Sequence, residues 1–215
     1  MRKQFAVIGL GRLGASVALT LSELGHDVLA IDIVESNVQA IVNDVTHAVK
    51  ADARDEDTLK ALGIRNFDVA IVAIGNDIEA NILTTLMLKE MGVKIVVSEA
   101  INASHAKVLE KIGADRIVYP EKDMGIRLAH NLDTHNVLDY IELTPGYSIL
   151  EIVVPKEYIG KSLGEVDLRA KYGTSVLAVR KEEAVIVAPG AEDKLDENDV
   201  IIVIGKNEDL TKLPE

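Results

Sequence analysis

Short apolar segments alternate with longer amphipathic segments along the first 120 residues. Phe5 to Ile8, Val28 to Ile31 and Val69 to Ile74 are each apolar at nearly every position, which is typical of parallel strands buried on both faces. Strand and helix patterns alternate as far as a strand over Arg116 to Tyr119. The remaining segments are expected as strands at 48–50 and 95–97, and as helices at 15–24, 35–44, 55–62, 78–91 and 104–112. This order predicts an α/β fold with a doubly wound parallel sheet over residues 1–120.

The pattern changes after residue 120. Residues 121–132 form an amphipathic pattern, and 137–143 alternates only partly before the turn at Pro145-Gly146. We interpret 121–145 as a segment that joins two lobes and packs an apolar face on another subunit, because solvation of so many apolar residues is unfavourable. Residues 146–215 predict a small α+β lobe. Its strands are expected at 148–154, 175–180, 184–187 and 200–204, and its helices at 163–172 and 207–213.

The first strand runs into a glycine-rich turn. Gly9, Gly11 and Gly14 have the spacing G-x-G-x-x-G, with Leu10 and Leu13 among the positions between them. Gly9 permits a tight exit from the strand, Gly11 lets a pyrophosphate approach the main chain, and Gly14 lets the next helix sit close to the strand. The N–H groups at the start of that helix attract an anion. The sequence therefore predicts a nucleotide site on a Rossmann-like lobe; the alternative is that the glycines only pack a tight strand-helix unit.

Two side chains beside this turn indicate which nucleotide it suits. Asp32 ends the second strand, where a ribose diol would bind, and it is followed by Ile33 instead of an arginine, which argues against NADP. Arg12 lies inside the glycine turn, where its guanidinium can bond terminal phosphate oxygens. ATP offers a γ-phosphate at this place, whereas a dinucleotide offers only bridging phosphates. The alternative for Arg12 is a surface ion pair with Glu23 or Glu35.

Other strand ends reach the same edge of the sheet. The further candidates there are Asp52, Ala53, Ala73, Ile74, Gly75 and Asn76. Asp52 is a candidate acceptor for an adenine amino group; the alternative is a helix N-cap or an exposed loop acid before the helix at 55–62. Gly75 and Asn76 are candidates to pack on the ribose and phosphates, or, with Asp77, to cap the helix at 78–91.

Composition and charge narrow the function further. The net charge of −12 would repel nucleic acid and anionic lipid, and no apolar run approaches the ~18 residues of a membrane span. The absence of cysteine excludes disulfides. The five histidines lack the spacing of a zinc site, and none lies in the small lobe. We interpret the nucleotide as a signal in a protein that is not an enzyme. The alternatives are a small NAD-dependent oxidoreductase, with His105 or His130 as the proton relay, and an NAD-sensing module.

Several segments together resemble a known family: F-A-V-I-G-L-G-R-L-G, A-I-G-N, V-L-E-K-I-G-A-D-R-I-V-Y-P-E-K-D-M and N-V-L-D-Y-I-E-L. They resemble the cytoplasmic regulatory subunits of Ktr bacterial potassium transporters, which are RCK-domain proteins of the TrkA family, of the KtrA and KtrC type. The resemblance covers essentially the full chain, and P-E-K-D-M is far more specific than the glycine turn. It implies a Rossmann lobe at 1–120 and an RCK C-lobe at 146–215.

The resemblance also implies an assembly and a partner. It implies a homo-octameric ring, built from dimers, that docks on a membrane channel subunit and so lies in the cytoplasm at the inner face of the cell membrane. ATP would favour the conducting state and ADP the closed state. By position, Arg12 would meet the γ-phosphate, Asp32 the ribose and Asp52 the adenine side. Glu99 is part of the same site and stands where a relative carries lysine, so its carboxylate would repel a polyphosphate.

Two further sites follow from the resemblance alone. Glu121 matches a carboxylate that contributes to a Mg²⁺ or Ca²⁺ site between paired subunits; its own context indicates only an acid favoured at a helix N-terminus. The C-lobe would bind cyclic di-AMP through Arg169, Ala170, Ser175 and Val176, with Ser175 where relatives often carry asparagine.

Overall fold

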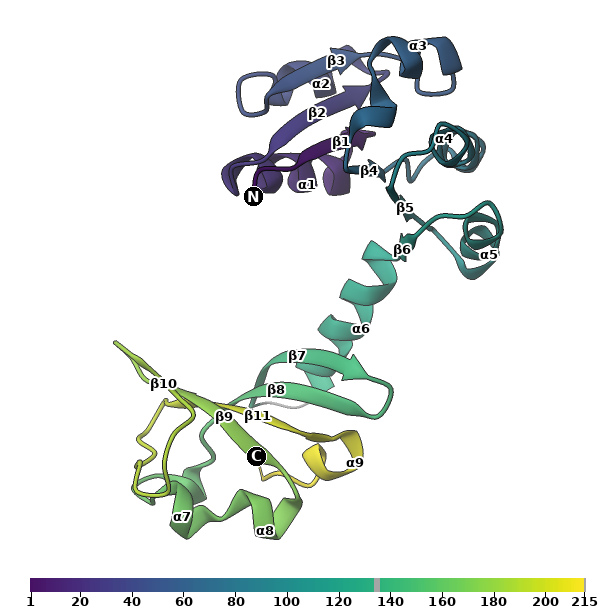
Figure 1. Cartoon of the computed structure of the whole chain (residues 1–215). Helices are drawn as coiled ribbons and strands as arrows, with labels where there is room; N and C mark the ends of the chain where they lie inside the picture. Colours follow the sequence, from purple (N-terminus) through teal and green to yellow (C-terminus); the bar gives the residue numbers. More distant parts are fainter. Residues whose placement is uncertain (134–135, 215) are drawn as a thin grey trace. The chain divides into compact units, whose positions relative to one another are not determined.

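The computed structural model describes residues 1–133 and 136–214 and divides the chain into two compact units, Met1–Glu121 and Lys122–Glu215 (Figure 1). The first unit, described throughout, is a six-stranded parallel sheet in the order β3-β2-β1-β4-β5-β6. Its strands are β1 (Gln4–Ile8), β2 (Asp27–Asp32), β3 (His47–Lys50), β4 (Val69–Val72), β5 (Ile95–Glu99) and β6 (Arg116–Val118). The prediction of a doubly wound sheet is confirmed.

Helices cover both faces of this sheet. They are α1 (Arg12–Glu23), α2 (Glu35–Ile41), α3 (Glu56–Ala61), α4 (Ile78–Glu90) and α5 (Ala103–Lys111), with a 3₁₀ turn η1 (Ile64–Asn66). Ala6 and Ile8 share a core with Leu59 of α3, while Val7 between them packs in a second core with Ala18 of α1. Successive strand residues point to opposite faces, so nearly every position of β1 has to be apolar.

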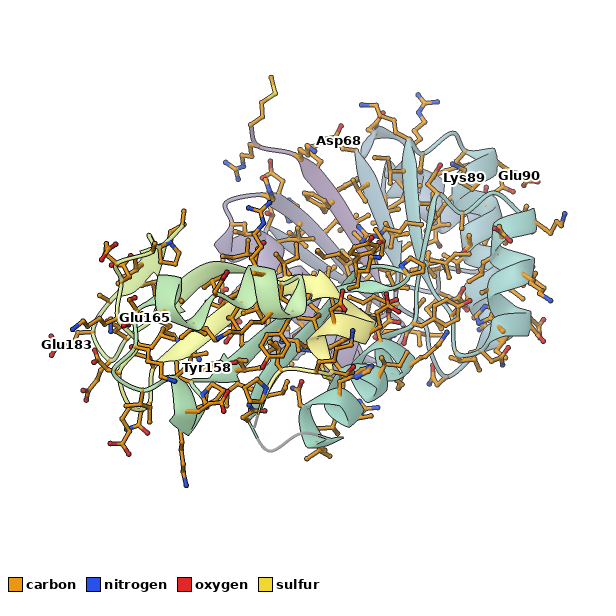
Figure 2. All side chains as sticks on the ribbon, turned by 90° about the horizontal axis from the view of Figure 1, so that it is seen from below. Asp68, Lys89, Glu90, Tyr158, Glu165 and Glu183 are labelled. Carbon is orange, nitrogen blue, oxygen red and sulfur yellow. The ribbon has the colours of Figure 1, made fainter. Side chains whose placement is uncertain are left out.

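Acidic side chains close the amino-terminal edge of this sheet. Asp68 accepts a hydrogen bond from the N–H of Gln4 at 3.1 Å. Asp115 accepts one from the N–H of Val96 at 2.7 Å and pairs with Lys89 at 2.7 Å (Figure 2 labels Asp68 and Lys89). These two strand N–H groups are therefore bonded within the protein, whereas ligands of open parallel sheets bind at the carboxyl-terminal edge.

The described part of the second unit is a five-stranded antiparallel sheet in the order β10-β9-β11-β8-β7. It begins with α6 (Pro120–Asp133), whose first two residues belong to the first unit. Its strands are β7 (Val137–Thr144), β8 (Tyr147–Val153), β9 (Ser175–Arg180), β10 (Val185–Val187) and β11 (Val200–Lys206). Its short helices are η2 (Lys156–Tyr158), α7 (Leu163–Val166), α8 (Leu168–Tyr172) and α9 (Asn207–Leu210). Ile152, Val179 and Ile201 lie at the centre of its core.

Two segments of this unit differ from the sequence prediction. β7, expected in the joining segment 121–145, pairs along β8 as an edge strand of the second sheet. The apolar residues Leu138, Ile141 and Leu143 of this edge strand are half-exposed. The sequence of β7 therefore lacks the clear alternation of apolar and polar residues that would have predicted a strand of the second sheet. The prediction of one helix over 163–172 is wrong: Asp167 has φ +48°, which ends α7, and its carboxylate caps α8. In the described ranges, no helix combines the length and apolarity that crossing a bilayer requires.

Candidate functional site

The three glycines at the carboxyl-terminal edge of the parallel sheet have different surroundings. Gly9 has φ +90°, and a Cβ there would lie 2.5 Å from the carbonyl oxygen of Ala73. A Cβ on Gly14 would overlap the carbonyl oxygen of Gly9. Gly11 differs, because among the described residues no atom of the surrounding protein lies within 4 Å of where its Cβ would be. The fold itself requires Gly9 and Gly14, so the packing interpretation accounts for these two glycines and leaves Gly11 unexplained.

The start of α1 is open toward solvent. Its N-cap, Gly11, has no side chain, and the first turn contains no acid, so its leading N–H groups have no side-chain acceptor among the described residues. Arg12, the first residue of α1, is exposed and forms no ion pair within the described ranges. Glu35, one of its predicted partners, lies 3.9 Å from Lys50. A helix end with free N–H groups and a free guanidinium favours an anion at this place.

Asp32 braces the glycine turn. It is only 8% exposed, and its carboxylate accepts hydrogen bonds from the N–H of Leu10 at 2.6 Å and the N–H of Val34 at 2.7 Å. The side-chain amide of Asn37 donates a third, at 3.1 Å. These bonds fix the carboxylate at the end of β2, next to Ile33, which is half-exposed. A residue with this orientation can still accept a ribose hydroxyl on a remaining lone pair.

Asp52 has a partner that the sequence analysis missed. The guanidinium of Arg54 bonds its carboxylate at 2.7 Å, and this bond holds the pKa of Asp52 below its usual range. The N-cap alternative for Asp52 is wrong, because Asp55 caps α3 by accepting from the N–H of Asp57. The alternative of a loop acid stands, since Asp52 lies in the loop before α3 with its side chain 39% exposed. The spacing D-A-R was the available signal for the pair. An adenine amino group bound to Asp52 would have to share the carboxylate with Arg54.

Glu99 is a nearly buried acid at the end of β5. Its side chain lies against Gly75, where a Cβ would come within 2.9 Å of Oε1. Burial raises the pKa of Glu99, repulsion by Glu121 raises it further, and attraction to Arg12 lowers it. The net effect raises the pKa, so Glu99 is an acid that resists ionisation, and it lies beside the residues predicted to bind the nucleotide.

The remaining predicted residues of this edge lie close by in the chain. β4 ends at Val72, so Ala73 and Ile74 lie past the strand instead of inside it. Asp77 caps α4 by accepting from the N–H of Ala80 at 2.9 Å, whereas Asn76 is exposed and takes no part in the cap. Ala73 is bonded through its N–H to the carbonyl of Ile8 at 2.7 Å, which ties the end of β4 to the glycine turn.

Three other predicted residues of the edge differ in exposure. Ala53 is buried after β3, with its carbonyl accepting from the hydroxyl of Thr84 at 3.3 Å. Leu10 is buried, while Leu13 in the first turn of α1 is partly exposed. Because their side chains are buried, Leu10 and Ala53 contribute mainly main-chain atoms to the carboxyl-terminal edge of the sheet.

The two histidines of the oxidoreductase alternative have different surroundings. His105 of α5 is 3% exposed, neither of its ring nitrogens has a hydrogen-bond partner among the described residues, and burial lowers its pKa. His130 belongs to the second unit and stacks on Tyr140, with ring centroids 3.9 Å apart. A proton relay needs a bonded partner and access to a substrate, and His105 has neither.

The residues expected to bind cyclic di-AMP lie on two neighbouring elements of the second unit. Arg169 and Ala170 are exposed on α8, and Ser175 is exposed at the start of β9. Val176 is partly buried and packs against the core. In the part of the chain that the structure describes, Arg169 forms no ion pair, so its guanidinium is available to an anion.

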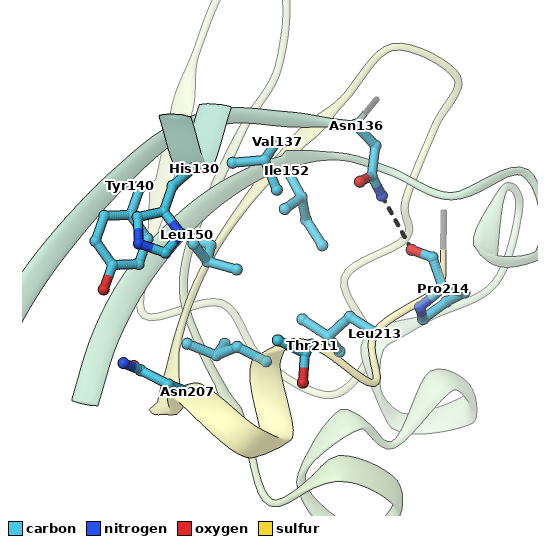
Figure 3. A pocket seen from close by; sticks show the side chains of 11 residues that line it. His130, Asn136, Val137, Tyr140, Leu150, Ile152, Asn207, Thr211, Leu213 and Pro214 are labelled. Carbon is cyan, nitrogen blue, oxygen red and sulfur yellow. Dashed lines mark hydrogen bonds between the residues drawn. The ribbon is translucent and has the colours of Figure 1, made fainter. Parts of the chain in front are cut away.

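The second unit also contains a cavity of about 140 Å³ (Figure 3). Its walls are mostly apolar, and the side chain of Asn136 at its rim is bonded to the carbonyl of Pro214. Its described lining residues include neither lysine nor arginine. Nucleotide sites are several times larger and need cationic or N–H donors for phosphate, so this cavity is not the predicted site.

Potential metal ligands are numerous in this acidic chain, but in the described ranges they do not form clusters. Glu121 is exposed in the first turn of α6, and no three side chains of histidine, cysteine, aspartate or glutamate among the described residues come together to hold an ion. Because Mg²⁺ and Ca²⁺ take six or more oxygen ligands, a site at Glu121 would need ligands from elsewhere, such as a second chain or water.

The parallel sheet with its glycine turn, followed by a small α+β lobe, defines a protein with a TrkA-N domain, matched over residues 5–120, and a TrkA-C domain, matched over residues 149–214. The chain is 50% identical to Ktr system potassium uptake protein C of Bacillus subtilis, covering 99% of this chain and 96% of the relative. It is 41% identical to Ktr system potassium uptake protein A of Vibrio alginolyticus, covering 97% of this chain and 94% of the relative. The chain belongs to the TrkA family, in the branch of the Ktr system potassium uptake proteins.

Solved structures support the same fold. A GsuK channel bound to NAD matches with a TM-score of 0.54 and 26% identity, over 97% of this chain and 37% of the channel chain. The TrkA-N domain of the inner membrane protein ybaL from Escherichia coli matches with a TM-score of 0.55 over 61% of this chain and 98% of that domain. At 16% identity, the second match shows the fold alone. This chain spans well under half of the GsuK channel.

Proposed function

We propose that this protein is the regulatory subunit of a Ktr-type potassium uptake system and that an adenine nucleotide at the turn Gly9 to Gly14 is its signal. The near full-length relationship to two Ktr proteins supports the first part. The observation that carries the second part is Gly11, whose missing side chain is not explained by any contact with the described residues. A pyrophosphate passing over this residue explains it.

ATP is the form that Arg12 favours. Its guanidinium starts at the open end of α1 and forms no ion pair within the described ranges, so a γ-phosphate would gain a charge-assisted bond that ADP lacks. Such a bond contributes about 1.5 to 3 kcal/mol. This range corresponds to an ATP preference of about ten- to a hundredfold. Asp32 would take the ribose, Asp52 the adenine side, and Gly75 and Asn76 would pack on the sugar and phosphates.

A ring assembly would add the small contributions of single sites. Moving a gate from 1:99 to 99:1 takes about 5.5 kcal/mol of differential binding, which exceeds one arginine-phosphate bond. We propose that an octameric ring, built from dimers and docked on a membrane channel subunit, sums these contributions. Apolar side chains that are exposed in the single chain support the burial of this surface against further subunits. On α6 and β7 they include Met124, Leu128, Leu132, Leu138 and Leu143. Solvation of these side chains in a lone chain would be unfavourable.

Two further ligands belong to this proposal. A Mg²⁺ or Ca²⁺ ion would bind Glu121 together with oxygen ligands from a second chain. Cyclic di-AMP would bind the second unit through Arg169, which is exposed and free of ion pairs within the described ranges, with Ala170, Ser175 and Val176 around it. Replacing Arg169 by alanine should abolish cyclic di-AMP binding and leave ATP binding unchanged, which equilibrium dialysis with each nucleotide would measure.

A second candidate signal is NAD(H). It is favoured by the NAD named in the GsuK channel structure and by Asp32 followed by Ile33, which suits an unphosphorylated ribose. Here too we propose a sensor instead of an oxidoreductase, and the burial of His105, one of the two relay candidates, without a partner among the described residues supports this.

Calorimetric titration with ATP, ADP and NADH, beside a mass measurement in solution, tests the proposal. Replacing Arg12 by alanine should bring the affinities for ATP and ADP to the same value. Arg2→Ala is the matched control, because Arg2 is an exposed arginine of the same unit that pairs with Asp27 at the opposite edge. An ATP preference that persists in the Arg12 variant, or tight NADH binding without ATP binding, would refute the assignment of ATP.

A further inference from the structure

A buried amide connects the ends of two central strands beneath the candidate site. Asn81, in the first turns of α4, is fully buried. Its side-chain nitrogen donates to the carbonyl of Ile74 at 3.0 Å and to the carbonyl of Glu99 at 3.1 Å. Its side-chain oxygen accepts from the hydroxyl of Ser98 at 2.8 Å, and that hydroxyl also bonds the hydroxyl of Thr85 at 3.1 Å.

The chemistry of these partners fixes the orientation of the amide. Two carbonyl oxygens accept and never donate, so the nitrogen of Asn81 has to face Ile74 and Glu99. The ladder between β4 and β5 ends at the pair Val72 and Ser98, so both carbonyls lie past its last pair. Asn81 therefore takes the place of a ladder bond where the strands stop pairing.

The residues on either side of this amide belong to the candidate site. Ile74 lies between Ala73 and Gly75 in the chain. Gly9 packs closely against the carbonyl oxygen of Ala73, and the Cα of Gly75 faces the carboxylate of Glu99. The main chain that Asn81 holds thus reaches the glycine turn in one direction and Glu99 in the other. A shift of either carbonyl would change how the Gly9 turn and Glu99 face each other.

We propose that Asn81 is a positioning residue for nucleotide discrimination: its amide holds the ends of β4 and β5 so that Gly75 and Glu99 keep their places against the glycine turn. This inference rests on the proposed adenine-nucleotide function and deepens it. Asn81 does not contact the ligand itself and acts through the ends of β4 and β5. Its removal therefore changes the ratio of the ATP and ADP affinities, and not only the stability of the fold.

The test compares isosteric variants of the full chain. Asn81→Asp keeps the shape of the side chain but loses both donors, while Thr85→Val removes one buried hydrogen bond of the same helix and leaves both carbonyls bonded. Titration with ATP and with ADP should show the ATP preference of Asn81→Asp falling by about fivefold, the effect of one ordinary hydrogen bond. Thr85→Val should keep the wild-type ratio even where it lowers the melting temperature.

A milder variant decides the matter if Asn81→Asp does not fold. Ser98→Ala leaves the Asn81 amide and its two carbonyl partners in place but removes the hydroxyl that donates to its side-chain oxygen, and a smaller fall of the ATP preference is expected. A variant that weakens ATP and ADP binding by the same factor, with an unchanged ratio, overturns the positioning role while leaving the proposed function intact. Wild-type protein that binds ATP and ADP equally, or neither, overturns the ATP-sensing proposal itself and this inference with it.

Discussion

Replacing Gly11 by alanine separates what the fold requires from what the ligand requires. Gly11 has φ −67° and ψ −165°, an extended conformation that alanine adopts. An added Cβ would find no atom of the surrounding described protein within 4 Å. Gly14 is the matched control, because a Cβ there would overlap the Gly9 carbonyl oxygen and come within 3.1 Å of the Ala73 side chain.

These surroundings set opposite expectations for the two variants. Gly11→Ala should change the free energy of unfolding by less than about 1 kcal/mol, with a gain expected from the reduced entropy of the unfolded chain. The same methyl group would occupy the path of a pyrophosphate, and we expect ATP affinity to fall at least about a hundredfold, or 2.7 kcal/mol. Gly14→Ala should destabilise the first unit by about 3 kcal/mol, because backbone atoms have to move to accommodate the methyl group.

Thermal unfolding with and without ATP measures both quantities. ATP at about a hundred times its dissociation constant stabilises the folded wild type by about 2.7 kcal/mol, which corresponds to roughly 5 to 10 °C for a chain of this size. Gly11→Ala should start from the wild-type melting temperature and lose this shift. Gly14→Ala should start several degrees lower.

One result would refute the reasoning. If Gly11→Ala binds ATP with wild-type affinity, no phosphate passes over this residue, and the turn serves only to pack α1 against β1. A variant that loses ATP binding and melts far below wild type would also count against it, because the loss would then come from the fold.

Three further expectations concern single side chains. Because burial raises the pKa of Glu99, this acid takes up a proton as the pH falls, and the loss of its charge should increase ATP affinity. Glu99→Gln should bind ATP more tightly than the wild type, and the ratio of the two affinities should approach one as the pH is lowered; the ratio cancels the protonation of the ATP phosphate itself. Burial lowers the pKa of His105, so below about pH 6.5 the unfolded chain binds a proton that the folded chain does not. The free energy of unfolding should therefore decrease as the pH is lowered below this value, and urea unfolding of His105→Leu should show a weaker dependence on pH. Lys181→Met leaves the nearly buried Asp199 without its 2.7 Å partner and should cost about 2 kcal/mol in urea unfolding, whereas Lys212→Met, which removes an exposed pair, should cost less than about 0.5 kcal/mol.

The sequence was sufficient to predict the parallel sheet because the apolar residues of each strand directly indicate that it is buried. A run such as Val69 to Val72 is apolar on both faces, and only a central strand covered by helices on both sides requires this. The break at Asp167 was not predictable by the same reasoning. A left-handed residue inside an otherwise helical pattern depends on the local main-chain geometry, and aspartate is compatible with either conformation.

The part of the candidate site that a single turn forms was predictable from the sequence. The prediction was incomplete for the part where several strand ends meet. Gly9 and Gly14 act within one strand-helix unit, so their spacing alone indicates their packing. The bond from Leu10 to Asp32 and the amide of Asn81 join segments that are adjacent only in the folded sheet. The one local signal for Asn81 was a polar residue at a buried position of a helix, which sequence periodicity does not distinguish from a surface residue.

The order of the strands has a consequence for how such proteins diversify. β1 to β6 make up the first sheet and β7 to β11 the second, so in the described chain neither sheet borrows a strand from the other unit. The main chain passes between the units once, after Glu121. A recombination event at that junction would exchange one complete module and interrupt no strand pairing. New ligand specificities can therefore be acquired by gene fusion at α6, while the glycine turn is inherited unchanged.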